Sequence, residues 1–189
     1  MADQVEIMNL ALGLLGADAR ITDPLEGSEV ARVMSARFPT ARDAAIRAHP
    51  WRFSLARARL AADIVPPAFG FGYRYLLPAD PYCLVVWQNV TDDMPPHVEG
   101  RYLLSDSAGP LDIVYGRRVD NPAEFDALFV EALAAKLAEQ SALRLTREES
   151  VRAAMSREFD RALMDARGIN ARESGAPPAP VSSFLLARR

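Results

Sequence analysis

The sequence predicts an α+β fold: a bundle of four long helices, a β-rich insertion between the second and third helices, and an extended C-terminal arm. Helical periodicity with capping residues covers both ends of the 189-residue chain. Between them, short β-branched and aromatic runs alternate with proline and glycine. We therefore expect a single domain over residues 1–168, with helices in 1–50 and 122–168 and the insertion at about 51–120. The arm is expected at 169–189.

The first two helices are expected at residues 3–16 and 28–49. Asp3 is followed three residues later by a glutamate, which is typical of a capping box, and glycine ends the first helix. Ser28 caps the second helix, and Pro39 is expected to kink or divide it, because proline lacks the amide hydrogen that an inner turn needs.

The insertion is read as a set of strands. The run "CLVVWQNV" is expected to be a buried strand, and its single cysteine, Cys83, a small buried hydrophobe. The stretch "GRYLLSDSAGPLDIVYGRR" reads as a hairpin that turns at "DSAGP". The tyrosines of "FGYRYLLPAD" could stack on bases, but only one arginine lies beside them. We therefore expect them to pack one face of a strand.

The last two helices are expected at 122–144 and 147–167, capped by Asn121 and Thr146. The four helices should pack through their apolar stripes as one bundle. The expected core residues are Leu12, Val30, Met34, Phe129, Leu133, Met155 and Phe159.

Composition argues against several functional classes. The formal net charge of −3 gives no sign of the basic surface that binds a phosphate backbone, so DNA is not an expected specific ligand. No apolar run is long enough to span a membrane, and the first residues lack the basic segment of a signal peptide. We therefore expect no association with a membrane, and we expect the protein to be made in the cytoplasm.

No motif whose spacing enforces a reaction mechanism is present, including nucleophile elbows, phosphate-binding loops and zinc-binding helices. The two histidines, His49 and His97, have no ligand-like neighbours. His97 could form a metal site with Asp92 and Asp93. Acidic side chains clustered in a loop are more often simply solvated, and we favour that interpretation. The prediction is no enzyme, no cofactor and no metal.

Arginine greatly outnumbers lysine, notably at Arg52, Arg57, Arg59, Arg117 and Arg118. The excess fits codon usage in a GC-rich genome. It equally fits subunit interfaces, where guanidinium groups make bidentate pairs with carboxylates. Both explanations of the arginine excess stay open.

Five segments in order carry a resemblance: "MNLALGLLGA", "ARDAAIRAHPWRF", "FGYRYLLPADPYCLVV", "EGRYLLSDSAGPLDIVYGRRV" and "FDALFVEALAAKLAEQSALRLT". Together they resemble the tail tubular protein A and head-to-tail adaptor family of tailed bacteriophages, over roughly residues 5–167. The resemblance implies a helical bundle with a β-rich insertion. It also implies a structural virion protein of the neck, assembled as a ring of about twelve copies beneath the portal. DNA would pass through the ring without specific binding.

The resemblance also implies two partners. One is the portal protein, which we expect the C-terminal arm to contact through an apolar cluster and two arginines: Phe184, Leu185, Leu186, Arg188 and Arg189. The other is the next tail component, a nozzle or tubular protein or a stopper. We expect it to contact the hairpin turn, Ser105, Asp106, Ser107, Ala108 and Gly109.

Two other classes remain as alternatives. One is a virion-associated peptidoglycan hydrolase, although no acid pair in a cleft is recognisable and a zymogram would test it. The other is a bacterial helical scaffold or regulatory domain. The neighbouring genes distinguish it from a phage adaptor, because portal and terminase genes would lie beside the gene of an adaptor.

Overall fold

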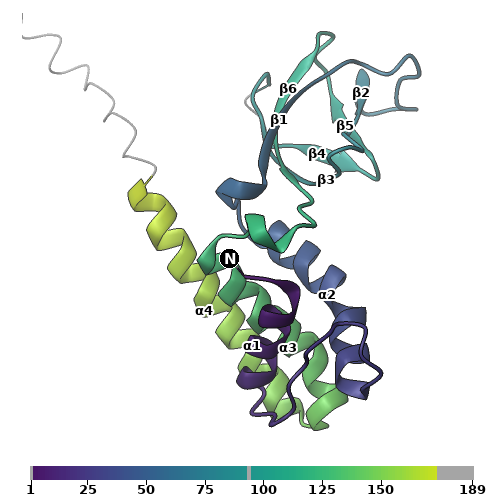
Figure 1. Cartoon of the computed structure of the whole chain (residues 1–189). Coiled ribbons are helices and arrows are strands. Elements are labelled where there is room, and N and C mark those ends of the chain that lie inside the picture. Colours follow the sequence, from purple (N-terminus) through teal and green to yellow (C-terminus); the bar gives the residue numbers. More distant parts are fainter. Residues whose placement is uncertain (1, 93–94, 174–189) are drawn as a thin grey trace, which may run out of the picture.

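A computed structural model describes residues 2–92 and 95–173, and the backbone alone of the last four of these. The helices are α1 (Gln4–Leu14), α2 (Glu29–Ala48), α3 (Ala127–Thr146) and α4 (Glu149–Glu173), with 3₁₀ turns η1 (Arg52–Ser54) and η2 (Pro122–Glu124). The strands are β1 (Leu55–Leu60), β2 (Tyr73–Leu76), β3 (Cys83–Asn89), β4 (His97–Glu99), β5 (Tyr102–Ser105) and β6 (Leu111–Arg117). Figure 1 shows the helices gathered into one body and the strands projecting from one end of it.

Helix α3 is the centre of the helical body, and α1, α2 and α4 each pack against it (Figure 1). It is buried on most sides, and not along a single stripe as expected. The reason is visible in "ALFVEALAAKLAEQSA", which is apolar nearly all round, because a helix of that kind is stable only when surrounded. Its buried residues are Phe129, Val130, Ala132, Leu133, Ala134, Ala135, Leu137, Ala138, Ser141 and Ala142.

The expected fold class is wrong in its main statement. The described chain is not mainly a bundle of four long helices, since α1 has only 11 residues and the helices make up less than half of the structure. The β-rich part is also more than a hairpin or one small sheet, because six strands form two three-stranded antiparallel sheets. The extended arm at 174–189 lies outside the described residues. Short apolar strands and a surrounded helix both depend on partners distant in sequence, which a local pattern does not reveal.

Several helix ends agree with the expected caps. Asp3 accepts a hydrogen bond from the Glu6 amide at 2.7 Å, and Ser28 caps α2 through the Ala31 amide at 3.2 Å. Pro39 does not divide α2. Asn121 caps the short η2 turn, and Asp126 caps α3 itself, so this helix begins five residues later than expected.

The predicted hairpin is also wrong. β5 and β6 are consecutive in the chain but do not pair with each other. β5 lies between β2 and β4 in one sheet, and β6 lies between β1 and β3 in the other. The connection 106–110 therefore crosses from one sheet to the other. Turn residues between two apolar runs specify a change of direction, whereas the partner of each strand depends on which side chains bury together.

The two sheets share a small hydrophobic core that is separate from the helical one. It is formed by Leu60, Tyr75, Leu77, Cys83, Leu103, Leu111, Ile113 and Tyr115. Tyr75 is fully buried while Tyr73 is partly buried, so the tyrosines pack a strand face as expected. Cys83 is buried, as expected, and its burial raises the pKa of its thiol.

The junction between the two parts is held by arginines. Asp43 on α2 accepts hydrogen bonds from Arg42 at 2.8 Å and from Arg118, which follows β6, at 3.0 Å. Arg42 also pairs with Asp120, and Arg47 donates to the carbonyl of Leu84 in β3. Such forked, charge-assisted contacts fix orientation as well as proximity. These arginines orient the β-rich part on the helical body within one chain.

Candidate interaction surfaces

Three strand connections lie together at the end of the β-rich part that faces away from the helices. The registers pair Leu60 with Leu111 and Asn89 with Ile113 in one sheet, and Ser105 with Tyr73 in the other. Hence β1, β3 and β5 end where β2, β4 and β6 begin, and the short connection 106–110 joins the two sheets at that same end. β1 starts and β6 finishes at the helical body (Figure 1). We call these connections, β1–β2, β3–β4 and β5–β6, the distal loops.

Of the expected tail-contact residues, Ser105 ends β5 and the other four, Asp106 to Gly109, lie in the last of the distal loops. Only part of this segment is available to a partner. Asp106, Ala108 and Gly109 are exposed, Ser107 is half-buried, and Ser105 is buried. The buried Tyr75 hydroxyl hydrogen-bonds the carbonyl oxygens of Ser107 and Gly109, the latter at 2.9 Å. The turn is therefore attached to the core of the β-rich part.

Asp92 ties the second distal loop to the third. Its carboxylate accepts hydrogen bonds from the hydroxyls of Ser105, at 2.5 Å, and Ser107, and from the Asn89 side chain at 2.7 Å. These bonds, that from Ser105 foremost, lower the pKa of Asp92. The ionised carboxylate thus favours the folded turn above its unfolded-state pKa, and this contribution is lost as the pH falls through the lower folded value. Asp92 therefore anchors one distal loop to the other.

The Tyr75→Phe variant should lose about 0.5–1.5 kcal/mol of stability, because the ring still fills its buried site while the turn loses the hydroxyl donor that its two carbonyl oxygens share. Urea unfolding followed by circular dichroism measures the loss. Tyr102→Phe is the matched control, since the Tyr102 hydroxyl has no hydrogen bond within the described residues. Equal midpoints for the two variants would show that the tyrosine does not hold the turn.

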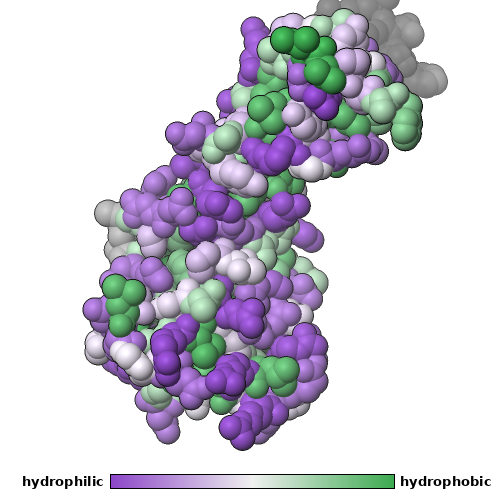
Figure 2. Space-filling view, turned by 90° about the vertical axis from the view of Figure 1, so that its right-hand side faces the viewer, coloured by the Kyte–Doolittle hydropathy of each residue, from purple (hydrophilic) through white to green (hydrophobic). Residues whose placement is uncertain are grey.

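The β1–β2 distal loop, residues 61–72, presents apolar side chains that the sequence analysis did not identify as a site. Its base is held by the Asp63–Arg74 ion pair at 3.0 Å and by the Gly72 amide, which donates to the Asp106 carboxylate at 2.8 Å. Beyond this base, Ile64 is 97% exposed and Phe69 is 88% exposed. Figure 2 shows hydrophobic atoms at the top of the β-rich part. The sequence signal for this exposed surface was the run "DIVPPAFGFG", in which apolar residues follow neither the period of a strand nor that of a helix.

A hollow of about 690 Å³ lies among the distal loops. Its lining includes Phe71, Thr91, His97, Leu104, Asp106 and Ser107. The ring centroids of His97 and Phe71 are 4.9 Å apart, and His97 lies 3.4 Å from Glu99. A fixed hollow beside an exposed apolar loop is suited to receive a side chain of a protein partner.

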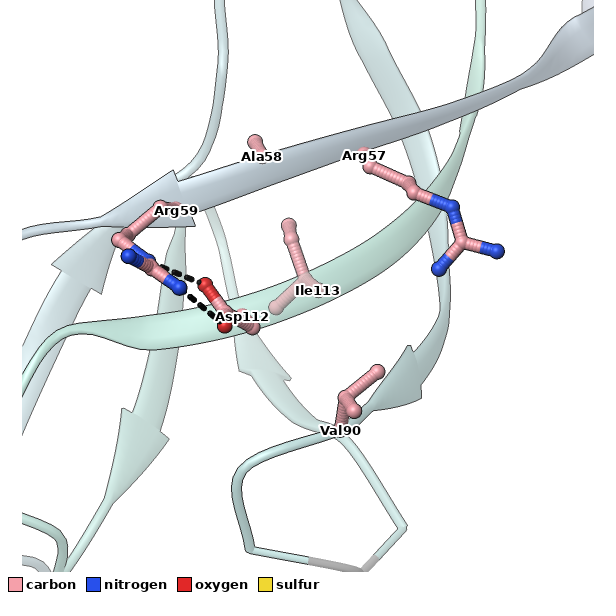
Figure 3. Close-up of a pocket in the computed structure, with 6 residues that line it drawn as sticks. All are labelled: Arg57, Ala58, Arg59, Val90, Asp112 and Ile113. Atoms are coloured by element: carbon pink, nitrogen blue, oxygen red, sulfur yellow. Dashed lines mark hydrogen bonds and ion pairs between the residues drawn. The ribbon is translucent and has the colours of Figure 1, made fainter.

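Figure 3 shows the residues that line a second hollow, of about 420 Å³, beside β1 and β6. Arg59 points at Asp112 and makes a bidentate pair at 2.7 and 2.8 Å, while Arg57 points away from it (Figure 3). The hydrogen bonds raise the pKa of Arg59 and lower that of Asp112. Because Arg59 is paired with Asp112, Arg57 is the arginine of this lining that remains available to an anion. One exposed arginine is weak support for an anion site.

Among the described residues, no three histidine, cysteine, aspartate or glutamate side chains gather so that they could hold a metal ion. Within the same part of the chain, no helix is both long and apolar enough to cross a membrane. His49 lies in the helical core with its ring centroid 4.8 Å from that of Trp51, and burial lowers its pKa. The expected portal-binding residues, Phe184, Leu185, Leu186, Arg188 and Arg189, lie outside the described residues.

Comparison with known proteins returned no match, either among protein-family models or among curated protein sequences.

Proposed function

We propose that this protein is a structural adaptor of a tailed-phage virion neck, one subunit of a ring beneath the portal. The observation that carries the proposal is the arrangement of the distal loops. A β-rich part projects from the helical body (Figure 1), and its β1–β2 distal loop carries two exposed apolar side chains, Ile64 and Phe69. The order of the sequence segments supports the same function through the resemblance described above.

In this proposal the helical bodies lie side by side in the ring and the distal loops contact the next tail component. Repeated heterologous contacts close into a ring when the rotation between neighbours permits it. The mildly acidic chain suits a channel through which DNA slides, because a surface of net negative charge does not retain phosphate. The arm residues Phe184, Leu185, Leu186, Arg188 and Arg189 are proposed to contact the portal.

Coexpression with the portal protein encoded in the same genome tests assembly. The expected product, seen by electron microscopy and native mass spectrometry, is a portal complex carrying a ring of about twelve adaptor copies. A genome without a portal gene, or a subunit that stays separate from portal complexes at micromolar concentration, would contradict the proposal.

Charged substitutions in the apolar loop test the tail contact. Ile64→Asp and Phe69→Asp should leave portal binding intact and reduce attachment of the tail component by about tenfold or more, because an apolar contact is replaced by an unpaired charge. Leu25→Asp is the matched control, since Leu25 is 89% exposed in the connection between α1 and α2. Co-sedimentation with the tail component gives the readout. Equal attachment by all three variants would place the contact elsewhere.

A further inference from the structure

The helical body has an apolar groove of about 510 Å³ between α1, α3 and α4. Leu10 and Leu14 on α1 remain substantially exposed there, although each lies beside a buried face of the same helix. Small residues, Gly13, Ala134 and Ala162, line the remainder of the groove and leave room above its floor. The groove has the shape and polarity for short aliphatic or aromatic side chains.

The rim of this groove is acidic. Glu131, Glu158 and Asp165 line it together with a single arginine, Arg161, which lies 3.8 Å from Glu158. Glu131 and Asp165 make no hydrogen bond or ion pair with any described residue. An apolar floor beside two unpaired carboxylates is complementary to a peptide segment in which a compact apolar cluster is followed by positive charge.

A segment of this chain outside the described residues has that chemistry. Phe184, Leu185 and Leu186 form the apolar cluster, and Arg188 and Arg189 follow it directly. We propose that in the free subunit residues 184–189 fold back and occupy the groove of their own chain, with the apolar triplet on Leu10 and Leu14 and the arginines at Glu131 and Asp165. This contact does not rest on the proposed adaptor function.

The spacer is long enough for a contact within one chain. From the end of α4 at residue 173 back to Ala162 is about 16 Å at the rise of an α-helix. The ten residues 174–183 can span up to about 33 Å, and Gly175 permits the reversal of direction. A tether of this length raises the effective concentration of the segment at its own groove to about the millimolar range, so the same subunit is favoured over a second copy.

Disulfide trapping in the full chain tests the proposal. Ala187→Cys is combined with Gly13→Cys in the groove, or with Gly27→Cys in the connection between α1 and α2 as the matched control. A β-carbon at either glycine meets open space, so both variants should fold, and the buried Cys83 is protected from oxidation. We expect the groove pair to form an intrachain disulfide about tenfold faster than the control pair, because docking concentrates one thiol at the other.

Charge reversal gives a second readout. Glu131→Lys with Asp165→Lys should slow trapping of the groove pair by about threefold or more, and Arg188→Glu with Arg189→Glu in the same chain should restore it. Equal rates for the groove and control pairs would overturn the proposal. Disulfide-linked dimers in place of the intrachain bond would also overturn it, by assigning the groove to a second copy. Trapping that charge reversal leaves unchanged would contradict the proposed place of the arginines.

Discussion

The Phe129→Ala variant should lose about 3–5 kcal/mol of stability, the largest effect expected for a single substitution in this protein. Phe129 is fully buried on the central helix α3. Its ring centroid lies 4.9 Å from that of Phe53, 4.8 Å from that of Phe125 and 5.1 Å from that of Trp51. These three rings belong to the segments by which the chain leaves and re-enters the helical body. The substitution therefore opens a cavity and loosens the base of the β-rich part together.

Urea unfolding followed by circular dichroism and tryptophan fluorescence measures this loss. Leu143→Ala on the same helix is the control, because Leu143 is 54% exposed and its truncation should change stability by no more than about 0.5 kcal/mol. A comparable loss in both variants would contradict the proposed role of the aromatic cluster, because alanine has the higher helix propensity at both positions and the two variants differ in burial.

The Asp43→Asn variant should lose about 2–3 kcal/mol, because it leaves two arginines without their shared carboxylate. The Arg42 side chain is only 9% exposed, while Arg118 and Asp43 retain some solvent contact, so the loss falls below that of a fully buried pair. The hydrogen bond with Asp43 raises the pKa of Arg118 above its ordinary value, as expected for a guanidinium held against a carboxylate. The denaturation midpoint reports the change.

Asp112→Asn is the matched control for the junction. It also removes a carboxylate from a bidentate arginine pair, but Arg59 and Asp112 are solvent-exposed, so the midpoint should hardly move. If the two variants unfold at the same midpoint, the Asp43 network does not orient the β-rich part. A salt titration adds a second distinction, since exposed pairs are screened more strongly than buried ones.

The sequence by itself determined the features that depend on neighbours along the chain. The caps at Asp3 and Ser28, the extent of α2, the buried strand that begins at Cys83 and the burial of Tyr75 all follow from local periodicity and side-chain type. The same local patterns placed the turn residues 106–110 correctly between two strands, although not in a hairpin. The portal-binding residues of the arm rest on resemblance and remain a prediction.

The tertiary structure alone decided which segments meet. β5 and β6 join different sheets, although a five-residue turn connects them, because Tyr75 and Leu103 bury against Leu111 and Ile113 from the opposite sheet. Arg118, for which codon usage and a subunit interface were both open explanations, pairs within its own chain with Asp43, 75 residues distant in sequence. The exposure of Ile64 and the acidic groove between α1, α3 and α4 are likewise products of packing. Strand partners, ion pairs and grooves depend on distances in space, which a linear pattern of side chains does not contain.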